Sequence, residues 1–129
     1  MGKRFAIVIG VAALAVAVPA LAGQTAKFDS RVTLPPPQKH PFHGVVRSIK
    51  HACEVHRKVK VFWQRPGPDR LLGGGTDWSN RSGNWSARQL VLAEGDYYAK
   101  VMRSKKNAAG TSFVCRGDRS PTRHVLHQG

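Results

Sequence analysis

Hydrophobic and polar residues alternate with a period of two in several short runs after position 42. Between positions 57 and 64, Val59, Val61 and Trp63 would lie on one face of an extended strand, with lysines on the other face. A similar run begins at Tyr97. No segment in this part of the chain keeps the 3.6-residue period of an amphipathic helix. The pattern therefore predicts an all-β domain built from half-buried strands.

Clusters of Gly, Pro, Asn and Asp separate these runs and provide the turns between strands. The predicted strands are Phe42–Ile49, Arg57–Gln64, Arg70–Asp77, Asn84–Leu92, Tyr97–Arg103, Thr111–Arg116 and Thr122–Leu126. Strands this short need two packed sheets or a barrel, because one sheet could not bury its own apolar face. We therefore expect one β domain over residues 42–126, followed by a short tail at 127–129.

The first 22 residues have the pattern of a secretory signal peptide. Lys3 and Arg4 precede an apolar run from Phe5 to Val18, and the small residues Ala20 and Ala22 follow at the positions that a signal peptidase reads. The apolar run is shorter than the roughly 20 residues that span a bilayer as a membrane anchor, which is the alternative. We expect cleavage after Ala22 and a secreted product without a stable membrane anchor.

Residues 23–41 differ in composition from the predicted strands that follow. They mix polar residues with the run Leu34-Pro35-Pro36-Pro37, which favours an extended polyproline conformation and cannot pair in a sheet. We therefore expect this segment to be an extended, disordered linker.

The chain contains two cysteines, Cys53 and Cys115. An even number of cysteines in an exported protein predicts a disulfide, whereas a catalytic or metal-binding thiol is less consistent with that compartment. In the chain-entropy model a bridge over a loop of this length stabilises the fold by about 4 kcal/mol.

Positive charge is the strongest compositional signal. Removal of Lys3 and Arg4 with the signal peptide leaves 19 of the 21 basic residues and all seven acids, a formal net charge of +12. Such a protein attracts polyanions such as nucleic acid, cell-wall polyanions or acidic glycans, although the charge could also serve solubility alone. The candidate polyanion contacts are Lys58, Lys60, Arg81, Arg88, Lys100, Arg103, Lys105 and Lys106.

The three tryptophans differ in their predicted surroundings. Trp63 and Trp85 fall on inward positions of predicted strands, whereas Trp78 lies beside the turn at 79–83. An exposed Trp78 could stack on a sugar or a base; the alternative is that it caps the end of the domain.

Catalytic and metal-binding patterns are missing from the sequence. The acids form no recognisable acid–base pair, and Gly73–Gly75 lacks the Lys and helix of a phosphate-binding loop, so these glycines predict a bulge or a flexible strand. His51, Cys53 and His56 are close in sequence but match no closed metal site. We therefore expect a protein that is not an enzyme and needs no metal or cofactor.

The tripeptide Arg116-Gly117-Asp118 is the one that integrin-type receptors recognise. In a chain this rich in Arg and Gly, a chance occurrence in a turn is the favoured interpretation.

A set of motifs between Phe42 and Val101 resembles the carboxypeptidase regulatory-like, or transthyretin-like, β-sandwich family. The motifs are Phe42-His43-Gly44-Val45-Val46, Arg57-Lys58-Val59-Lys60-Val61, Thr76-Asp77, Gly83-Asn84-Trp85 and Gly95-Asp96-Tyr97. The resemblance implies a seven-stranded antiparallel Greek-key β-sandwich that acts as a non-catalytic accessory or surface module. It carries no shared active site.

Charge and resemblance together predict a secreted, non-enzymatic binding module for anionic polymers. The alternative is a structural or envelope-associated protein that binds an extracellular protein through an open sheet edge. Salt should weaken the first kind of binding much more than the second.

Overall fold

The computed structural model describes residues 25–36, 42–88 and 94–126 of the 129-residue chain. The predicted signal peptide at 1–22 and the tail at 127–129 lie outside these ranges. The strands in the described ranges are β1 (Ala26–Phe28), β2 (Arg31–Val32), β3 (Phe42–Arg47), β4 (Lys58–Gln64), β5 (Arg70–Trp78), β6 (Asn84–Ala87), β7 (Gly95–Val101), β8 (Ser104–Ala108), β9 (Thr111–Cys115), β10 (Asp118–Arg119) and β11 (Arg123–Val125). A short 3-10 turn, η2, covers His51–Cys53. The fold is all-β, as predicted.

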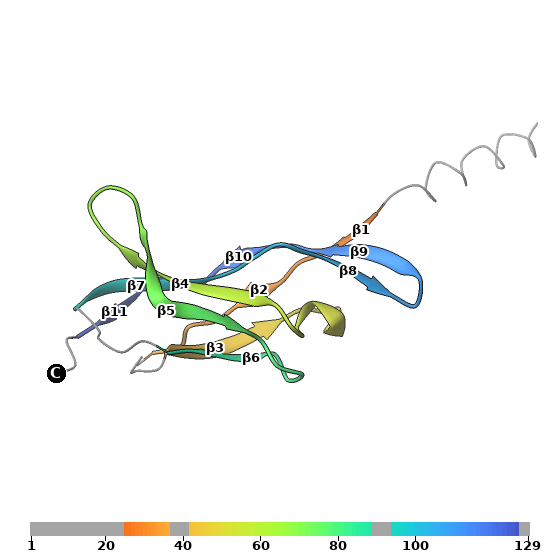
Figure 1. Cartoon of the computed structure of the whole chain (residues 1–129), viewed down its shortest axis with the longest axis horizontal. Helices are drawn as coiled ribbons and strands as arrows, with labels where there is room; N and C mark the ends of the chain where they lie inside the picture. The colour runs from red at the N-terminus through yellow and green to blue at the C-terminus, as the bar shows by residue number, and fades with distance from the viewer. Residues whose placement is uncertain (1–24, 37–41, 89–93, 127–129) are drawn as a thin grey trace, which may run out of the picture.

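Two sheets form the larger part of the molecule (Figure 1). The main sheet has the order β10-β7-β4-β5, and β11 pairs with the same strand, β7. The second sheet has the order β2-β3-β6. This arrangement of two layers is compatible with a β-sandwich, and we refer to the two sheets together as the body.

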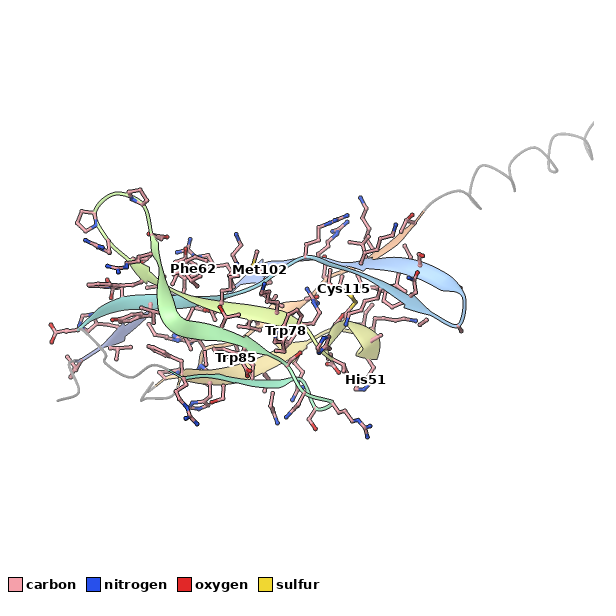
Figure 2. The ribbon with its side chains drawn as sticks, viewed as in Figure 1. His51, Phe62, Trp78, Trp85, Met102 and Cys115 are labelled. Carbon is pink, nitrogen blue, oxygen red and sulfur yellow. A yellow bond between two sulfur atoms is a disulfide. The ribbon has the colours of Figure 1, made fainter. Side chains whose placement is uncertain are left out.

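The core of the body lies between its two sheets and follows from the two-residue alternation of the strands. On β4, Val59 and Val61 are fully buried, and on β7 Ala99 and Val101 are fully buried. Trp85 of β6 faces them from the other sheet and is 2% exposed, as its predicted inward position required (Figure 2). The core cluster comprises Val32, Leu34, Phe42, Val46, Val59, Val61, Trp85, Ala87, Tyr97, Ala99, Val101 and Val125.

A third sheet, with the order β1-β9-β8, extends beyond the end of the β3–β6 layer (Figure 1). We call it the distal sheet. Its strands β8 and β9 continue β7 and β10 along one long hairpin, because Ser104 pairs with Cys115 and Val101 pairs with Asp118 in the same register. The disulfide predicted between Cys53 and Cys115 is present and joins η2 to β9.

The prediction of a linker over residues 23–41 is wrong for residues 25–36. β1 pairs in parallel with β9, and β2 pairs with β3 through Val32 and Val46. Val32 and Leu34 are fully or almost fully buried in the core. Burial of these two alternating apolar residues stabilises a strand just before the prolines, and the proline run obscured that signal.

Each of the seven predicted strands has a counterpart, and the structure adds the short strands β1, β2, β8 and β10. β6 ends at Ala87, before the predicted end at Leu92; residues 89–93 lie outside the described ranges. The register of β4 with β5 shifts across the glycine-rich part of β5, because Lys60 pairs with Thr76 whereas Phe62 pairs with Leu71; this is compatible with the predicted bulge or flexible strand.

No helix among the residues that the structure places is long and apolar enough to cross a membrane.

Candidate functional site

Three of the basic side chains on the main sheet stand in one row across its strands. Lys60 of β4 is directly opposite Lys100 of β7, and Lys100 is directly opposite Arg119 of β10. Side chains opposed in this way have Cβ atoms about 5 Å apart. Lys58 lies on the same face, two residues before Lys60 on β4. We call Lys58, Lys60, Lys100 and Arg119 the basic ladder.

The ladder lies on the outer face of the main sheet, because its residues alternate with buried core positions such as Val59 and Val101. Lys100 and Arg119 are exposed, and Lys58 and Lys60 are partly exposed. Phe62 and Met102 lie on the same side of the sheet, away from Trp85 (Figure 2).

Within the described ranges, no carboxylate forms an ion pair with a residue of the ladder. The nearby acids have other partners. Asp96 pairs with His124 at 2.9 Å, Asp69 accepts a hydrogen bond from the Tyr98 hydroxyl, and Asp77 accepts one from the backbone N–H of Ser86. Like charges directly opposite one another destabilise a sheet. The ladder is therefore a concentrated positive field that the fold itself does not neutralise.

Tyr98 positions one member of the ladder. The Arg119 guanidinium lies 3.7 Å from the centre of the Tyr98 ring, a cation–π contact, and Phe62 stacks on the same ring with a centroid distance of 5.4 Å. Burial raises the pKa of Tyr98, and the hydrogen bond to Asp69 raises it further. Tyr98 therefore stays neutral at physiological pH and holds Arg119 beside Lys100.

Trp78 is 48% exposed, so the condition for the stacking hypothesis is met. Its ring already stacks on His56 at a centroid distance of 4.5 Å, and Lys58 Nζ lies 5.6 Å from the ring centre. A base or a sugar would therefore have to compete with these contacts. Stacking of a ligand on Trp78 stays a prediction, and the contact with Lys58 links this ring to the ladder.

The other predicted basic contacts lie apart from the ladder. Arg81 is exposed in the turn between β5 and β6, and Arg88 is exposed just after β6, in the second sheet. Arg103 is exposed between β7 and β8. Lys105 is exposed on the distal sheet, opposite Val114.

Lys106 is held inside the fold instead of being free to bind a ligand. Its ammonium donates a 2.7 Å hydrogen bond to the carbonyl of Val55 and approaches the carbonyl of His56 at 3.4 Å. Burial lowers the pKa of Lys106, and the nearby charge of Arg57 lowers it further. We therefore leave Lys106 out of the candidate site.

The Arg116-Gly117-Asp118 tripeptide is used by the fold. The Asp118 carboxylate accepts a 2.9 Å hydrogen bond from the backbone N–H of Val32, and Arg116 forms an ion pair with Asp29 at 3.1 Å. These contacts provide a structural role for both charged side chains and agree with a chance match to the receptor motif.

Each of the candidate metal ligands Cys53, His51 and His56 has a different partner in the structure. Cys53 is in the disulfide, His51 contacts Glu54 at 3.0 Å, and His56 stacks on Trp78. In the part of the chain that the structure covers, no group of three or more His, Cys, Asp or Glu side chains is placed to hold a metal ion.

Arg119 is the ladder residue that sequence reasoning missed, because β10 is only two residues long. The sequence signal was Gly110, a residue type that favours the positive φ angle that it adopts in the turn with Ala109. Counting outward from that turn places Arg119 opposite Lys100.

The chain matches no protein-family model, and neither curated proteins nor solved structures include a significantly similar one.

Proposed function

We propose that the protein is exported and binds linear anionic polymers through the basic ladder. The observation that carries this proposal is the row formed by Lys60, Lys100 and Arg119, which stand in register and have no carboxylate partner among the residues described. Three basic residues whose Cβ atoms are about 5 Å apart offer an extended line of positive side chains instead of a single point. A polymer with regularly repeated anionic groups can lie across the strands and contact several of them at once.

Tyr98, the aromatic residue in contact with Arg119 of the ladder, favours recognition by charge over recognition of bases. Tyr98 is only 6% exposed, and its ring is in contact with both Phe62 and Arg119. Single-stranded nucleic acid binders instead present open aromatic rings to successive bases. We therefore infer binding with little dependence on sequence, driven by the release of counterions from the polymer.

The proposed location outside the cytosol is supported by the buried disulfide and by the signal-peptide pattern of the first 22 residues. The finer fold assignment, a Greek-key sandwich related to the carboxypeptidase regulatory-like domains, is part of the same proposal. Its support is that the motif-bearing segments of the sequence all contribute strands to the two sheets of the body.

The test compares two double variants that remove the same charge from different places. Lys60→Gln/Lys100→Gln takes two cations from the ladder, whereas Arg81→Gln/Arg88→Gln takes two exposed cations from the β5–β6 turn and the end of β6. Affinity for heparin, duplex DNA and poly-glutamate would be measured by fluorescence titration over a range of salt concentrations. Each variant needs a circular dichroism spectrum that matches the wild type.

We expect the ladder variant to weaken polymer binding by about tenfold or more at low salt and to reduce the salt slope of log K by about 1.5. The control variant should change affinity much less. Equal losses in the two variants would mean that net charge alone drives binding, and the proposal would then be wrong. The same panel of polymers ranks phosphate, sulfate and carboxylate as the preferred group.

The alternative of binding a protein through a sheet edge is less well supported. β8 is an outer strand of the distal sheet, as the described residues form it, but it bears Lys105 and Lys106. Lysines on an edge strand discourage pairing with another strand. Binding that survives high salt would nevertheless favour a protein partner over a polymer.

A further inference from the structure

The distal sheet carries a second group of cations, away from the basic ladder. On its central strand, β9, Val114 stands opposite Lys105 of β8 on one side and opposite Lys27 of β1 on the other. Both lysines are exposed. Neighbouring strands lie about 4.8 Å apart, so about 10 Å separate Lys27 from Lys105 across the sheet. Arg103, two positions before Lys105, is also exposed. We call Lys27, Arg103 and Lys105 the distal cations.

The distal cations lie on the face of the distal sheet that points away from its small apolar cluster. Phe113 and Cys115 alternate with Val114 on β9 and pack with Cys53 on the other face. Val114 is only 4% exposed, and lysine stems commonly cover apolar side chains while their ammonium groups stay in water. The β3–β6 layer, which covers the corresponding face of the body, ends before the distal sheet (Figure 1). Cations therefore line this face where the second layer of strands stops.

The charge of the distal cations is not neutralised by the residues that the structure places. Among those residues, no carboxylate forms an ion pair with Lys27, Arg103 or Lys105. Arg116, at the end of β9, differs because it pairs with Asp29 at 3.1 Å, and we therefore leave it out of the group. Exposed cations without a counter-charge attract polyanions. The distal sheet thus presents a second positive surface.

The ladder and the distal cations lie on opposite faces of the ribbon that β7 and β8 form with β10 and β9. The strand pairing keeps one register from the body into the distal sheet. Lys105 comes five residues after Lys100 of the ladder, and an odd separation along a strand places two side chains on opposite faces. A polymer that lies across the ladder therefore leaves the distal cations free to contact a second chain.

We propose that the distal cations form a second, weaker site for the same anionic polymers, so that one protein molecule bridges two chains. This inference rests on the proposed function of the ladder. The distal site is weaker because Val114 separates its two lysines across the sheet, whereas Lys60, Lys100 and Arg119 are directly opposite one another. Two sites on different faces draw anionic chains together instead of only coating them.

The test measures bridging directly, with the oxidised protein and short DNA duplexes that carry either a donor or an acceptor fluorophore. Energy transfer between duplexes reports bridging, and the anisotropy of one labelled duplex reports binding. The distal variant, Lys27→Gln/Lys105→Gln, removes two exposed cations from the distal sheet. The ladder variant and the control variant of the polymer-binding test lose the same charge elsewhere. Each protein needs a circular dichroism spectrum that matches the wild type.

We expect the wild type to give energy transfer when duplex is in excess and to lose it when protein is in excess, because each duplex then has its own protein molecule. The distal variant should reduce the energy transfer about tenfold and change the affinity for a single duplex by less than about twofold. The control variant should keep most of the signal. In NMR spectra of the wild type, the first equivalent of duplex should shift amides of β4, β7 and β10, and further equivalents those of β1 and β8.

Two results would overturn the bridging proposal and leave the ladder in place. One is energy transfer in the distal variant equal to that of the wild type, while the ladder variant binds a single duplex weakly. The other is an equal loss of energy transfer in the distal and control variants, which would mean that net charge alone gathers the duplexes. Unchanged affinity in the ladder variant is a different failure, because it would remove the proposed function on which bridging rests.

Discussion

The body and the distal sheet are built from similar strands but are stabilised by different interactions. The body has an apolar core to which both of its sheets contribute, including Phe42, Val61 and Trp85. The distal sheet has a much smaller cluster, formed by Cys53, Phe113 and Cys115 with Phe28 and Ala52 packed against it. Hydrophobic burial accounts for the first region, whereas the second needs specific cross-links.

Three such cross-links act on the distal sheet. The disulfide ties β9 to η2, and Lys50 Nζ lies 5.1 Å from the centre of the Phe113 ring and 5.6 Å from that of Phe28. The third is Arg57, a fully buried residue just before β4. Its guanidinium donates hydrogen bonds to Ser30 Oγ and to the carbonyls of Cys53, Met102 and Arg116, at 2.7, 2.8, 2.7 and 3.0 Å.

The interactions that stabilise the distal sheet are also separate from the residues that we propose bind polymers. The basic ladder lies on β4, β7 and β10 in the body, where the core fixes the strands that present it. The cross-links lie where the distal sheet meets the body. Loss of a cross-link should therefore affect the distal sheet first and polymer binding least, and the following predictions test that order.

The largest effect is expected from removing the disulfide with Cys53→Ala/Cys115→Ala. The bridge closes a loop with a sequence separation of 62, and in the chain-entropy model its loss lowers the free energy of global unfolding by about 4 kcal/mol. Because the bridge is anchored in β9, amide hydrogen exchange should show that β8 and β9 lose more protection than β4 and β7.

The matched control is Thr111→Ala, an exposed substitution on β9 that leaves the bridge intact. If β4 and β7 lost as much protection as β8 and β9 in the double variant, the body and the distal sheet would be one cooperative unit. The distinction between the two regions would then be wrong.

The sequence predicted the body better than the distal sheet for the same physical reason. Strands packed on a core show alternation, and Val59, Val61 and Trp85 were correctly placed facing inward. β8 lies on an outer edge and has the sequence Ser-Lys-Lys-Asn-Ala, so no apolar period marks it. β1 is three residues long, too short to show a period. The cysteine count nevertheless predicted the disulfide.

The candidate site was predictable only in part. The charge and the outward positions of Lys58 and Lys60 followed from the strand pattern, but the pairing of strands brought Lys100 and Arg119 beside them. A charged residue at the start of a predicted strand is expected to be exposed, so the sequence did not predict that Arg57 is buried. It depends on four acceptors that come from distant parts of the chain.

The next largest effect is expected from Arg57→Met, at the junction of the body and the distal sheet. The substitution keeps an apolar stem and leaves four acceptors without their donor, so we expect a loss of about 3 kcal/mol. Chemical denaturation followed by circular dichroism measures it. Arg103→Met, at an exposed position between β7 and β8, is the control.

An equal, small loss in the two arginine variants would mean that the cost of burying the Arg57 charge offsets its hydrogen bonds. Burial already lowers the pKa of Arg57, which shows the direction of that cost. Arg57 would then be replaceable by an apolar residue, and the disulfide would be the principal link between the regions.

The smallest effect is expected from Glu54→Gln, next to η2, and it depends on pH. Glu54 Oε2 accepts a hydrogen bond from the Ser48 N–H at 3.1 Å, and Oε1 lies 3.0 Å from His51 Nδ1. The Ser48 and His51 contacts lower the pKa of Glu54 from its usual 4.5, with a further contribution from Arg47. The ionised carboxylate therefore holds the segment that carries Cys53 in place.

Since the folded pKa of Glu54 is lowered, its contribution is present in full above the unfolded value and is lost as pH falls through the folded value. We expect Glu54→Gln to lose about 1 kcal/mol at pH 7, the scale of one hydrogen bond to a charged group. The difference from wild type should shrink as pH falls below 4.5. Glu94→Gln, at an exposed position before β7, is the control. A difference that stayed constant down to strongly acidic pH would show that Glu54 acts through packing, and that the junction contains no titratable link.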